Sequence, residues 1–230
     1  MDIRKLPETF NRMARRDPYW AALTHRDNWT DEEFYSSGRA LAAKILETAS
    51  GLRVHRFDAA LDFGCGPGRI AQALSERFKA VIGVDISPVM LAKAVTMNRH
   101  THRCSYILNA APNLERFSSG SFDLVHSAIT LQHVAPSLAL VYVGEFIRLL
   151  RSDGMAIFDI PEKPAPGVLG TILRVAPAWV LRPIRKLDMY GHCESKVREA
   201  VESAGGRVLL KEQAPDAGPR WISWRYYCTR

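Results

Sequence analysis

The chain has 230 residues, of which 47% are hydrophobic and 24% charged, a balance typical of a globular protein with one full core. Its formal charge of +7 is scattered without a long lysine and arginine run, which favours a solvated basic surface over a nucleic-acid-binding one. No apolar run is long enough for a membrane span, and the first residues lead into no signal segment, so we expect a cytoplasmic protein.

The four cysteines are not arranged as a metal site. Cys65, Cys104, Cys193 and Cys228 form no Cys-x-x-Cys pair and have no histidine at a ligand spacing. We therefore expect reduced thiols and no bound metal.

Residues 1–50 predict a helical cap that precedes the first strand. Pro18 interrupts its first helical segment, because a residue that precedes proline is pushed out of the helical region. Thr30 and Glu33 then form a capping-box sequence, which opens a second helix running to about Ala49.

The central stretch of the chain begins with a short apolar run at residues 59–63, as expected of a strand buried on both faces. Gly64, Gly66 and Gly68 follow it in alternation. Glycine permits positive φ and lets a ligand approach the backbone closely. Apolar residues then recur with a helical period over residues 69–78, so the glycine turn leads into a helix.

A second apolar run at residues 80–84 ends at Asp85. A strand, a glycine turn, a helix and a second strand that ends in a carboxylate form a nucleotide-type site. The acid is placed to accept hydrogen bonds from ribose hydroxyls. The dinucleotide fingerprint requires its third glycine where this chain has Arg69, so the spacing argues against a dinucleotide.

The alternation of strands and helices continues toward the C-terminus. Ser87 and Pro88 start a helix that carries Met90. Further strands are expected at residues 104–109, 122–127 and 155–160, with a helix at 141–150 that Ser152-Asp153-Gly154 closes. This alternation implies parallel βαβ units.

The last part of the chain has a different pattern. Residues 163–187 hold five basic residues and no acid among apolar side chains. A helix is expected at 192–204 and strands at 207–212 and 221–229. The whole pattern predicts one α/β domain with a doubly wound, Rossmann-like, mostly parallel seven-stranded sheet whose last strand is antiparallel. Residues 51–230 form its core, including an insertion at 163–190.

Asp62 stands two residues before the first glycine, giving Asp-x-Gly-x-Gly-x-Gly, which resembles motif I of the class I S-adenosylmethionine-dependent methyltransferases. Residues 122–125 and 149–154 also look like the fourth-strand and pre-fifth-strand motifs of the broad small-molecule methyltransferase group. The resemblance covers about residues 57–160, and more loosely the terminal hairpin. It implies S-adenosylmethionine as the cofactor.

The resemblance also implies roles for individual residues. Three glycines line the cofactor, Asp62 lies near its methionine end, Asp85 binds the ribose hydroxyls and Ile86 flanks the adenine. The full set expected at the cofactor is Asp62, Gly64, Cys65, Gly66, Gly68, Asp85, Ile86, Met90, Asn109, Ala110, Ala111 and Ser127. The family often has an acid after the third strand. This chain has Asn109-Ala110-Ala111 instead, which leaves Asn109 or a backbone group to take that place.

In related proteins the residues after the fourth strand lie beside the transferred methyl group. His133 is therefore the candidate general base, since imidazole titrates near neutral pH. The alternative is a structural histidine at the start of the next helix. The residues expected at the methyl acceptor are Tyr19, Trp20, Gln132, Trp179 and Tyr190. Tyr19 and Trp20 could equally pack the N-terminal segment onto the core.

The chain lacks the Asn-Pro-Pro-Tyr type of motif after the fourth strand, which argues against amino-methylating nucleic-acid enzymes. We expect methyl transfer to an oxygen or nitrogen atom of a small acceptor, such as an apolar or natural-product-like compound. The alternatives are an RNA or protein methyltransferase and a non-catalytic cofactor-binding module. For residues 163–187 three interpretations stay open: an extra packed layer, a lid over the acceptor, or contact with an anionic membrane surface.

Overall fold

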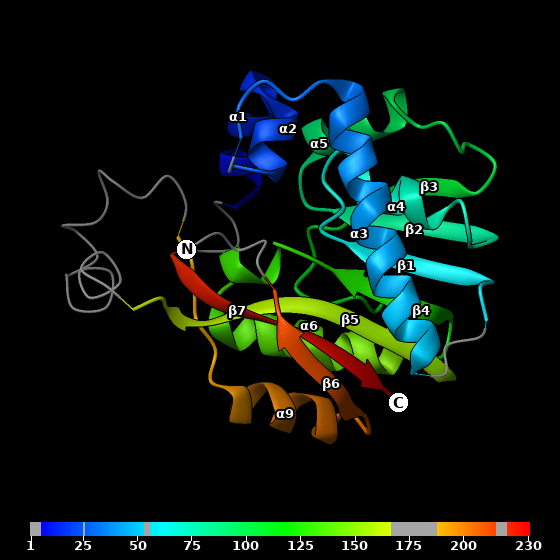
Figure 1. Ribbon diagram of the computed structural model, residues 1–230, viewed down its shortest axis with the longest axis vertical. Coiled ribbons are helices and arrows are strands. Elements are labelled where there is room, and N and C mark those ends of the chain that lie inside the picture. The colour runs from blue at the N-terminus through cyan, green and yellow to red at the C-terminus, as the bar shows by residue number, and fades with distance from the viewer. Residues whose placement is uncertain (1–5, 25, 53–55, 167–187, 215–219) are drawn as a thin grey trace.

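The structure is a computed structural model that describes residues 6–24, 26–52, 56–166, 188–214 and 220–230. Its middle layer is a seven-stranded sheet with strand order β3-β2-β1-β4-β5-β7-β6 (Figure 1). Strand β7 runs antiparallel to both of its neighbours, and the remaining neighbouring pairs are parallel. The predicted α/β fold is confirmed, including its antiparallel last strand.

The elements alternate along the chain as predicted. The strands are β1 (Ala59–Phe63), β2 (Ala80–Asp85), β3 (Cys104–Leu108), β4 (Phe122–Ser127), β5 (Leu150–Pro164), β6 (Arg207–Gln213) and β7 (Trp221–Thr229). The helices are α1 (Leu6–Arg16), α2 (Pro18–Ala22), α3 (Asp31–Gly51), α4 (Arg69–Leu74), α5 (Pro88–Thr96), a 3₁₀ helix at Leu131–His133, α6 (Pro136–Leu149) and α9 (Glu194–Ser203). No helix in this part of the chain is both long and apolar enough to cross a bilayer.

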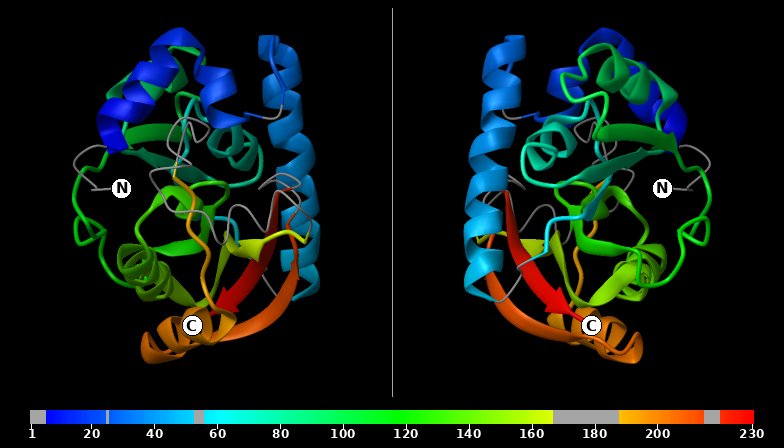
Figure 2. Two further views of the ribbon diagram at one scale, coloured as in Figure 1. Left: turned by 90° about the vertical axis from the view of Figure 1, so that its left-hand side faces the viewer. Right: turned by 90° about the vertical axis from the view of Figure 1, so that its right-hand side faces the viewer.

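The sheet separates two apolar cores. On one face α3, α4 and α5 pack over Ala60 and Leu124, and on the other α6 and α9 pack over Leu61 and Val125. Helix α3 runs along one side of the molecule in both views of Figure 2. Because successive strand residues point to opposite faces, a strand covered on both sides is apolar at most of its positions. This explains the short unbroken apolar runs in the sequence.

Side-chain caps begin three of the helices, and the sequence predicts two of these caps, at Thr30 and Ser87. The Thr30 hydroxyl accepts from the Glu33 amide while the Glu33 carboxylate accepts from the Thr30 amide, so the capping box is formed. The Asp17 carboxylate accepts from the first amides of α2, and the Ser87 hydroxyl accepts from the Met90 amide in α5.

Several predicted boundaries were wrong. Ser152-Asp153-Gly154 was expected to close a helix but lies within β5. Leu150 pairs with Phe122 while Met155 pairs with Leu124, so residues 151–154 bulge out of the ladder. Helix α4 also ends at Leu74 rather than Phe78, and α6 begins at Pro136 rather than Val141.

The predicted cap divides into two parts. Helix α3 packs directly on the sheet, where Ile45 and Ala49 belong to the core. Helices α1 and α2 instead pack against α5 through Ala14, Ala21 and Met90. The division into cap and core stays a prediction. Of the predicted insertion, Lys163 and Pro164 belong to β5 and residues 167–187 lie outside the described residues.

Asp123 joins three segments of the sheet. One of its carboxylate oxygens accepts from the amides of Asp58 and Ala59, both at 2.8 Å, at the start of β1. The other accepts from Arg151 Nη1 at 2.7 Å, in the bulge of β5. The side chain is buried, so these contacts replace water that the carboxylate has lost.

We predict that Asp123→Ala lowers the free energy of unfolding by about 2–4 kcal/mol, because it leaves two amides and a guanidinium without their acceptor. Urea unfolding at pH 7 measures the change. Asp153→Ala, which removes an exposed acid of the same bulge, serves as the control and should change stability by less than about 0.5 kcal/mol. Equal effects of the two substitutions would contradict the assigned role.

Candidate functional site

The glycine turn between β1 and α4 lies at the carboxyl edge of the sheet, held against neighbouring strands. The amides of Gly64 and Cys65 donate to the Val84 carbonyl at 2.7 and 3.0 Å. Gly64 has φ +73°, and a Cβ there would lie 2.1 Å from Thr130 Oγ1. Gly68 has φ +84°, and a Cβ there would lie 2.3 Å from the Tyr106 hydroxyl. Both positions therefore require glycine, as expected of a backbone cradle.

Asp85 ends β2 and faces the middle of this turn. The Gly66 amide donates to its Oδ2 and the Ser87 amide to its Oδ1, each at 2.8 Å. Burial raises the pKa of Asp85 to about 6, although the amides of Ser87, Gly66 and Ile86 act to lower it. The structure thus brings the carboxylate and the glycine turn together, as the sequence predicted.

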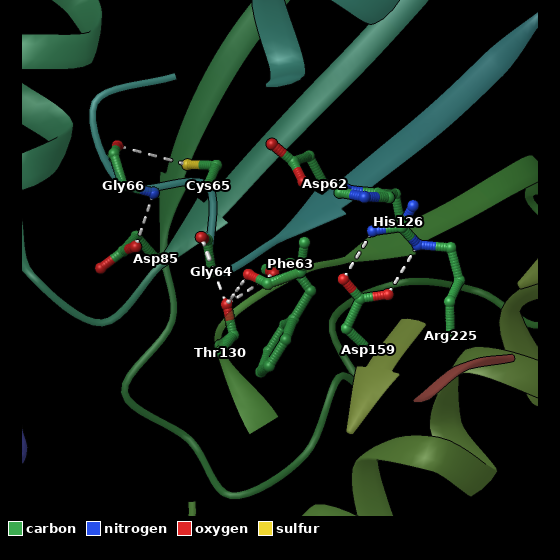
Figure 3. Close-up of polar contacts among 11 residues, drawn as sticks. Asp62, Phe63, Gly64, Cys65, Gly66, Asp85, His126, Thr130, Asp159 and Arg225 are labelled. Carbon is green, nitrogen blue, oxygen red and sulfur yellow. Dashed lines mark hydrogen bonds and ion pairs between the residues drawn. The ribbon is translucent and has the colours of Figure 1, made fainter. Parts of the chain in front are cut away.

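Asp62 is the second-to-last residue of β1 and lies on the opposite side of the turn from Asp85 (Figure 3). Its Oδ1 accepts from His126 Nδ1 at 2.8 Å, and both side chains are almost fully buried. His126 occupies the corresponding place in β4 and is the register partner of Asp62. Within the described part of the chain, Asp62 Oδ2, His126 Nε2 and the buried hydroxyl of Ser127 have no hydrogen-bond partner.

The two carboxylates make this region electronegative. Among the described residues, no lysine or arginine forms an ion pair with Asp62 or Asp85. Burial raises the pKa of the Cys65 thiol well above its usual range, and the charges of Asp85 and Asp62 raise it further. Such a region favours a ligand that brings positive charge and hydrogen-bond donors.

Hydrogen bonds from Asn109 and Tyr142 hold the loop after β3. Asn109 Nδ2 donates to the carbonyls of Ala111 and Asn113 at 3.2 and 3.0 Å, and the Tyr142 hydroxyl also donates to Ala111. The amide nitrogen of Asn109 therefore shapes the loop, while Ala110 and Ala111 are exposed. Contact of these three residues with a cofactor stays a prediction.

Ile86 and Met90 lie beyond Asp85. Ile86 is partly exposed, whereas Met90 is buried under the first two helices against Ala14 and Ala21. The Ser87 hydroxyl contacts Asn11 Oδ1 of α1 at 2.6 Å. The N-terminal helices therefore adjoin this side of the turn.

His133 lies in the 3₁₀ helix after β4 with both ring nitrogens in hydrogen bonds. Nδ1 lies 2.9 Å from the Asp188 carbonyl, so this nitrogen donates, and the amide of Gln132 donates to Nε2 at 3.0 Å. Burial lowers the pKa of His133, although Asp188 acts to raise it. The Gln132 carbonyl accepts from the Tyr190 amide at 2.9 Å, so these three predicted residues are neighbours.

Two of the remaining predicted acceptor residues, Tyr19 and Trp20, belong to α2. The Tyr19 hydroxyl donates to Asp31 at 2.5 Å, and the Tyr19 ring stacks on Phe34 with centroids 4.2 Å apart. Trp20 is partly buried, and its amide donates to Asp17. Trp179 lies outside the described residues. The acceptor-binding roles of all three stay predictions.

Sequence reasoning missed several residues around the turn. His126 was interpreted as a packed strand residue, although Asp62 and His126 are each second to last in two adjacent parallel strands. Their equivalent positions in adjacent parallel strands could have identified the two side chains as neighbours. Thr130 covers Gly64, and the preceding Ile129 has φ +61°, which no sequence pattern predicts for a β-branched residue. Phe10 contacts the His133 ring at 5.7 Å between centroids.

Within the described residues, no group of three or more histidine, cysteine, aspartate or glutamate side chains is placed to hold a metal ion. The four cysteines are unpaired, three of them buried and Cys193 exposed.

Part of this chain matches a known protein domain. Residues 60–154 match the family model described as a methyltransferase domain. An uncharacterized methyltransferase of Synechocystis sp. is 30% identical over 101 residues, covering 44% of this chain and 46% of the relative. The ubiquinone biosynthesis O-methyltransferase of Acinetobacter baumannii is 24% identical over 144 residues, covering 62% of this chain and 58% of the relative. The chain thus spans about half the length of these relatives.

One solved structure is similar to this protein over the whole chain. Magnesium protoporphyrin IX methyltransferase from Synechocystis PCC 6803, crystallised with bound SAH, superposes with a TM-score of 0.70 at 16% identity, covering 100% of both chains. Residues 60–154 therefore match a methyltransferase domain, and the chain as a whole has the fold of the class I S-adenosylmethionine-dependent methyltransferases.

Proposed function

We propose that the protein is an S-adenosylmethionine-dependent methyltransferase that methylates an oxygen or nitrogen atom of a small molecule. One observation carries the proposal: the glycine turn lies between two carboxylates, the buried Asp62 and the partly buried Asp85, that no described lysine or arginine neutralises. S-adenosylmethionine carries two cationic groups and ribose hydroxyls, which complement those carboxylates.

The residues present fit this cofactor. Positions 64 and 68 leave no space for a Cβ, and Asp62 Oδ2 is a buried acceptor that lacks a donor. Asp85 would accept from the ribose hydroxyls, Asp62 would receive the cationic amino-acid end, and Ile86 would flank the adenine. When bound, the cofactor supplies a methyl group activated by its sulfonium.

The chain's own residues would align the acceptor and exclude water. Positioning and desolvation lower the barrier to a displacement. His133 would remove the acceptor's proton once Gln132 releases Nε2, and Gln132 would then be available to orient the acceptor. Phe10 of α1 packs on the His133 ring and would help to close this side of the site.

Support for a small acceptor comes from two similar proteins whose names specify magnesium protoporphyrin IX methylation and ubiquinone biosynthesis. The test is to incubate the purified chain with methyl-labelled S-adenosylmethionine and fractionated metabolites, RNA or protein. Label in the metabolite fraction supports the proposal. Label confined to RNA or protein would identify the other acceptor class, and binding without transfer to any fraction would favour a non-catalytic module.

The raised pKa of Asp85 predicts a pH dependence of binding. Methylthioadenosine is a suitable probe, since it carries the ribose and adenine and no group that titrates near pH 6. Because the ionised carboxylate accepts the ribose hydroxyls, affinity should fall as pH decreases through about 6, and be about tenfold weaker at pH 5 than at pH 7.5.

Calorimetry with Asp85→Asn is the companion measurement. This variant should bind methylthioadenosine about 10- to 100-fold more weakly at pH 7.5, and its affinity should no longer change with pH. Glu76→Gln, at an exposed acid just beyond α4, is the control and should behave as the wild type. A wild-type affinity that is flat between pH 5 and pH 7.5 would contradict the role of Asp85.

A further prediction concerns His133. His133→Ala should lower turnover by roughly 100-fold and leave the affinity for S-adenosylhomocysteine nearly unchanged, since a general base acts on the acceptor. Because burial lowers the pKa of His133, the neutral ring persists below its usual range, and the acidic limb of the wild-type rate should lie there. His102→Ala, at an exposed histidine, is the control. Loss of cofactor affinity together with turnover would instead indicate a structural role.

A further inference from the structure

Asp62 and His126 form a buried pair that is only half satisfied. Nδ1 of His126 must be the donor to Asp62 Oδ1, because a carboxylate can only accept. The second oxygen of Asp62 and Nε2 of His126 have no partner among the described residues, although both side chains are almost wholly buried.

A purely structural role does not account for this arrangement. A buried acceptor without a donor costs about 1–3 kcal/mol, and more when it is charged. A buried Asp62 that served only packing would have both oxygens satisfied, as Asp123 does through Asp58, Ala59 and Arg151. The unfilled oxygen of Asp62 therefore indicates a donor that arrives with a ligand.

The oxygen of Asp62 that has no donor among the described residues points toward the glycine turn. Figure 3 shows Asp62 Oδ2 turned away from His126, on the side where Cys65 and the glycine turn lie. The Asp62 charge contributes to raising the pKa of both Cys65 and Asp85, in agreement with this placement.

The other side of the His126 ring faces the strands beyond β4. His126 is paired with Ile157 of β5, and two residues along that strand Asp159 forms a bidentate pair with Arg225 of β7 at 2.7 Å. Figure 3 shows the His126 ring beside this buried ion pair.

We propose that His126 is a positioning residue for the amino-acid end of the cofactor. Its Nδ1–H holds one oxygen of Asp62, so that the other oxygen is presented to a primary ammonium group entering beside the glycine turn. This inference rests on the proposed function, because it takes S-adenosylmethionine as the source of the ammonium.

The experiment compares two amides at position 126. His126→Asn keeps an N–H donor near the place of Nδ1, whereas His126→Gln carries the same amide one carbon farther out and cannot donate to Asp62 Oδ1 from the same place. Calorimetry measures affinity for S-adenosylhomocysteine and for its analogue that lacks only the α-amino group. Thermal unfolding of each variant checks that it is folded.

We expect the wild type and His126→Asn to prefer S-adenosylhomocysteine over the desamino analogue by about tenfold or more, as for a hydrogen bond to a charged group. In His126→Gln this preference should fall to about threefold or less, while affinity for the analogue is unchanged. His126→Leu, which removes the donor without adding a polar group, should behave as His126→Gln and replaces it if that variant is unfolded.

Three results would overturn the inference. The preference could survive in folded His126→Gln or His126→Leu, affinity for both ligands could fall together, or His126→Asn could fail to restore the preference. A wild type that binds neither ligand would give a different outcome, since it would remove the proposed function and the inference with it. A wild type that binds both ligands equally would remove the inference alone.

Discussion

The glycine turn from β1 into α4 is the constraint on which the rest of the site depends. The turn is held to Val84 by two amides while Thr130 and Tyr106 approach Gly64 and Gly68 more closely than any Cβ would permit. These contacts come from β2, β3 and the loop after β4. The turn therefore joins these three segments to β1 at the carboxyl edge of the sheet. Both carboxylates of the site then lie beside it.

Burying Asp62 with one oxygen that has no donor among the described residues costs stability. Asp123, Asp159 and Arg225 are also buried, but they have partners. Arg225 and Asp159 share two hydrogen bonds of 2.7 Å across β5 and β7, and Asp123 satisfies the start of β1. This contrast separates groups that maintain the fold from the open oxygen of Asp62, for which we infer a ligand.

The N-terminal helices link the two ends of the site. Asn11 contacts Ser87 next to Asp85, and Phe10 packs on His133. Farther along, the Tyr35 hydroxyl of α3 donates to the Pro67 carbonyl within the turn itself. A movement of α1 would therefore change the surroundings of both Asp85 and the candidate base His133. Such coupling fits a reaction from which water must be excluded.

The sequence alone determined the features that depend on a few neighbouring residues. Strands β1 and β4 were predicted with their observed bounds, because strands buried on both faces are short segments rich in apolar residues. The caps at Thr30 and Ser87 follow from local hydrogen bonding, and the positive φ of the glycine turn follows from the absence of a Cβ. Asp85 beside the turn follows from its position at the end of a neighbouring parallel strand.

Only the tertiary structure decided the rest. The bulge at residues 151–154 arises from the pairing of β5 with β4, and the contact of Asp62 with His126 arises from the register of β1 and β4. Residues far along the chain satisfy Nδ1 of His133, through the Asp188 carbonyl, and the guanidinium of Arg225, through Asp159. Propensity acts over a few residues, whereas strand register and the return of distant segments depend on how the whole chain packs.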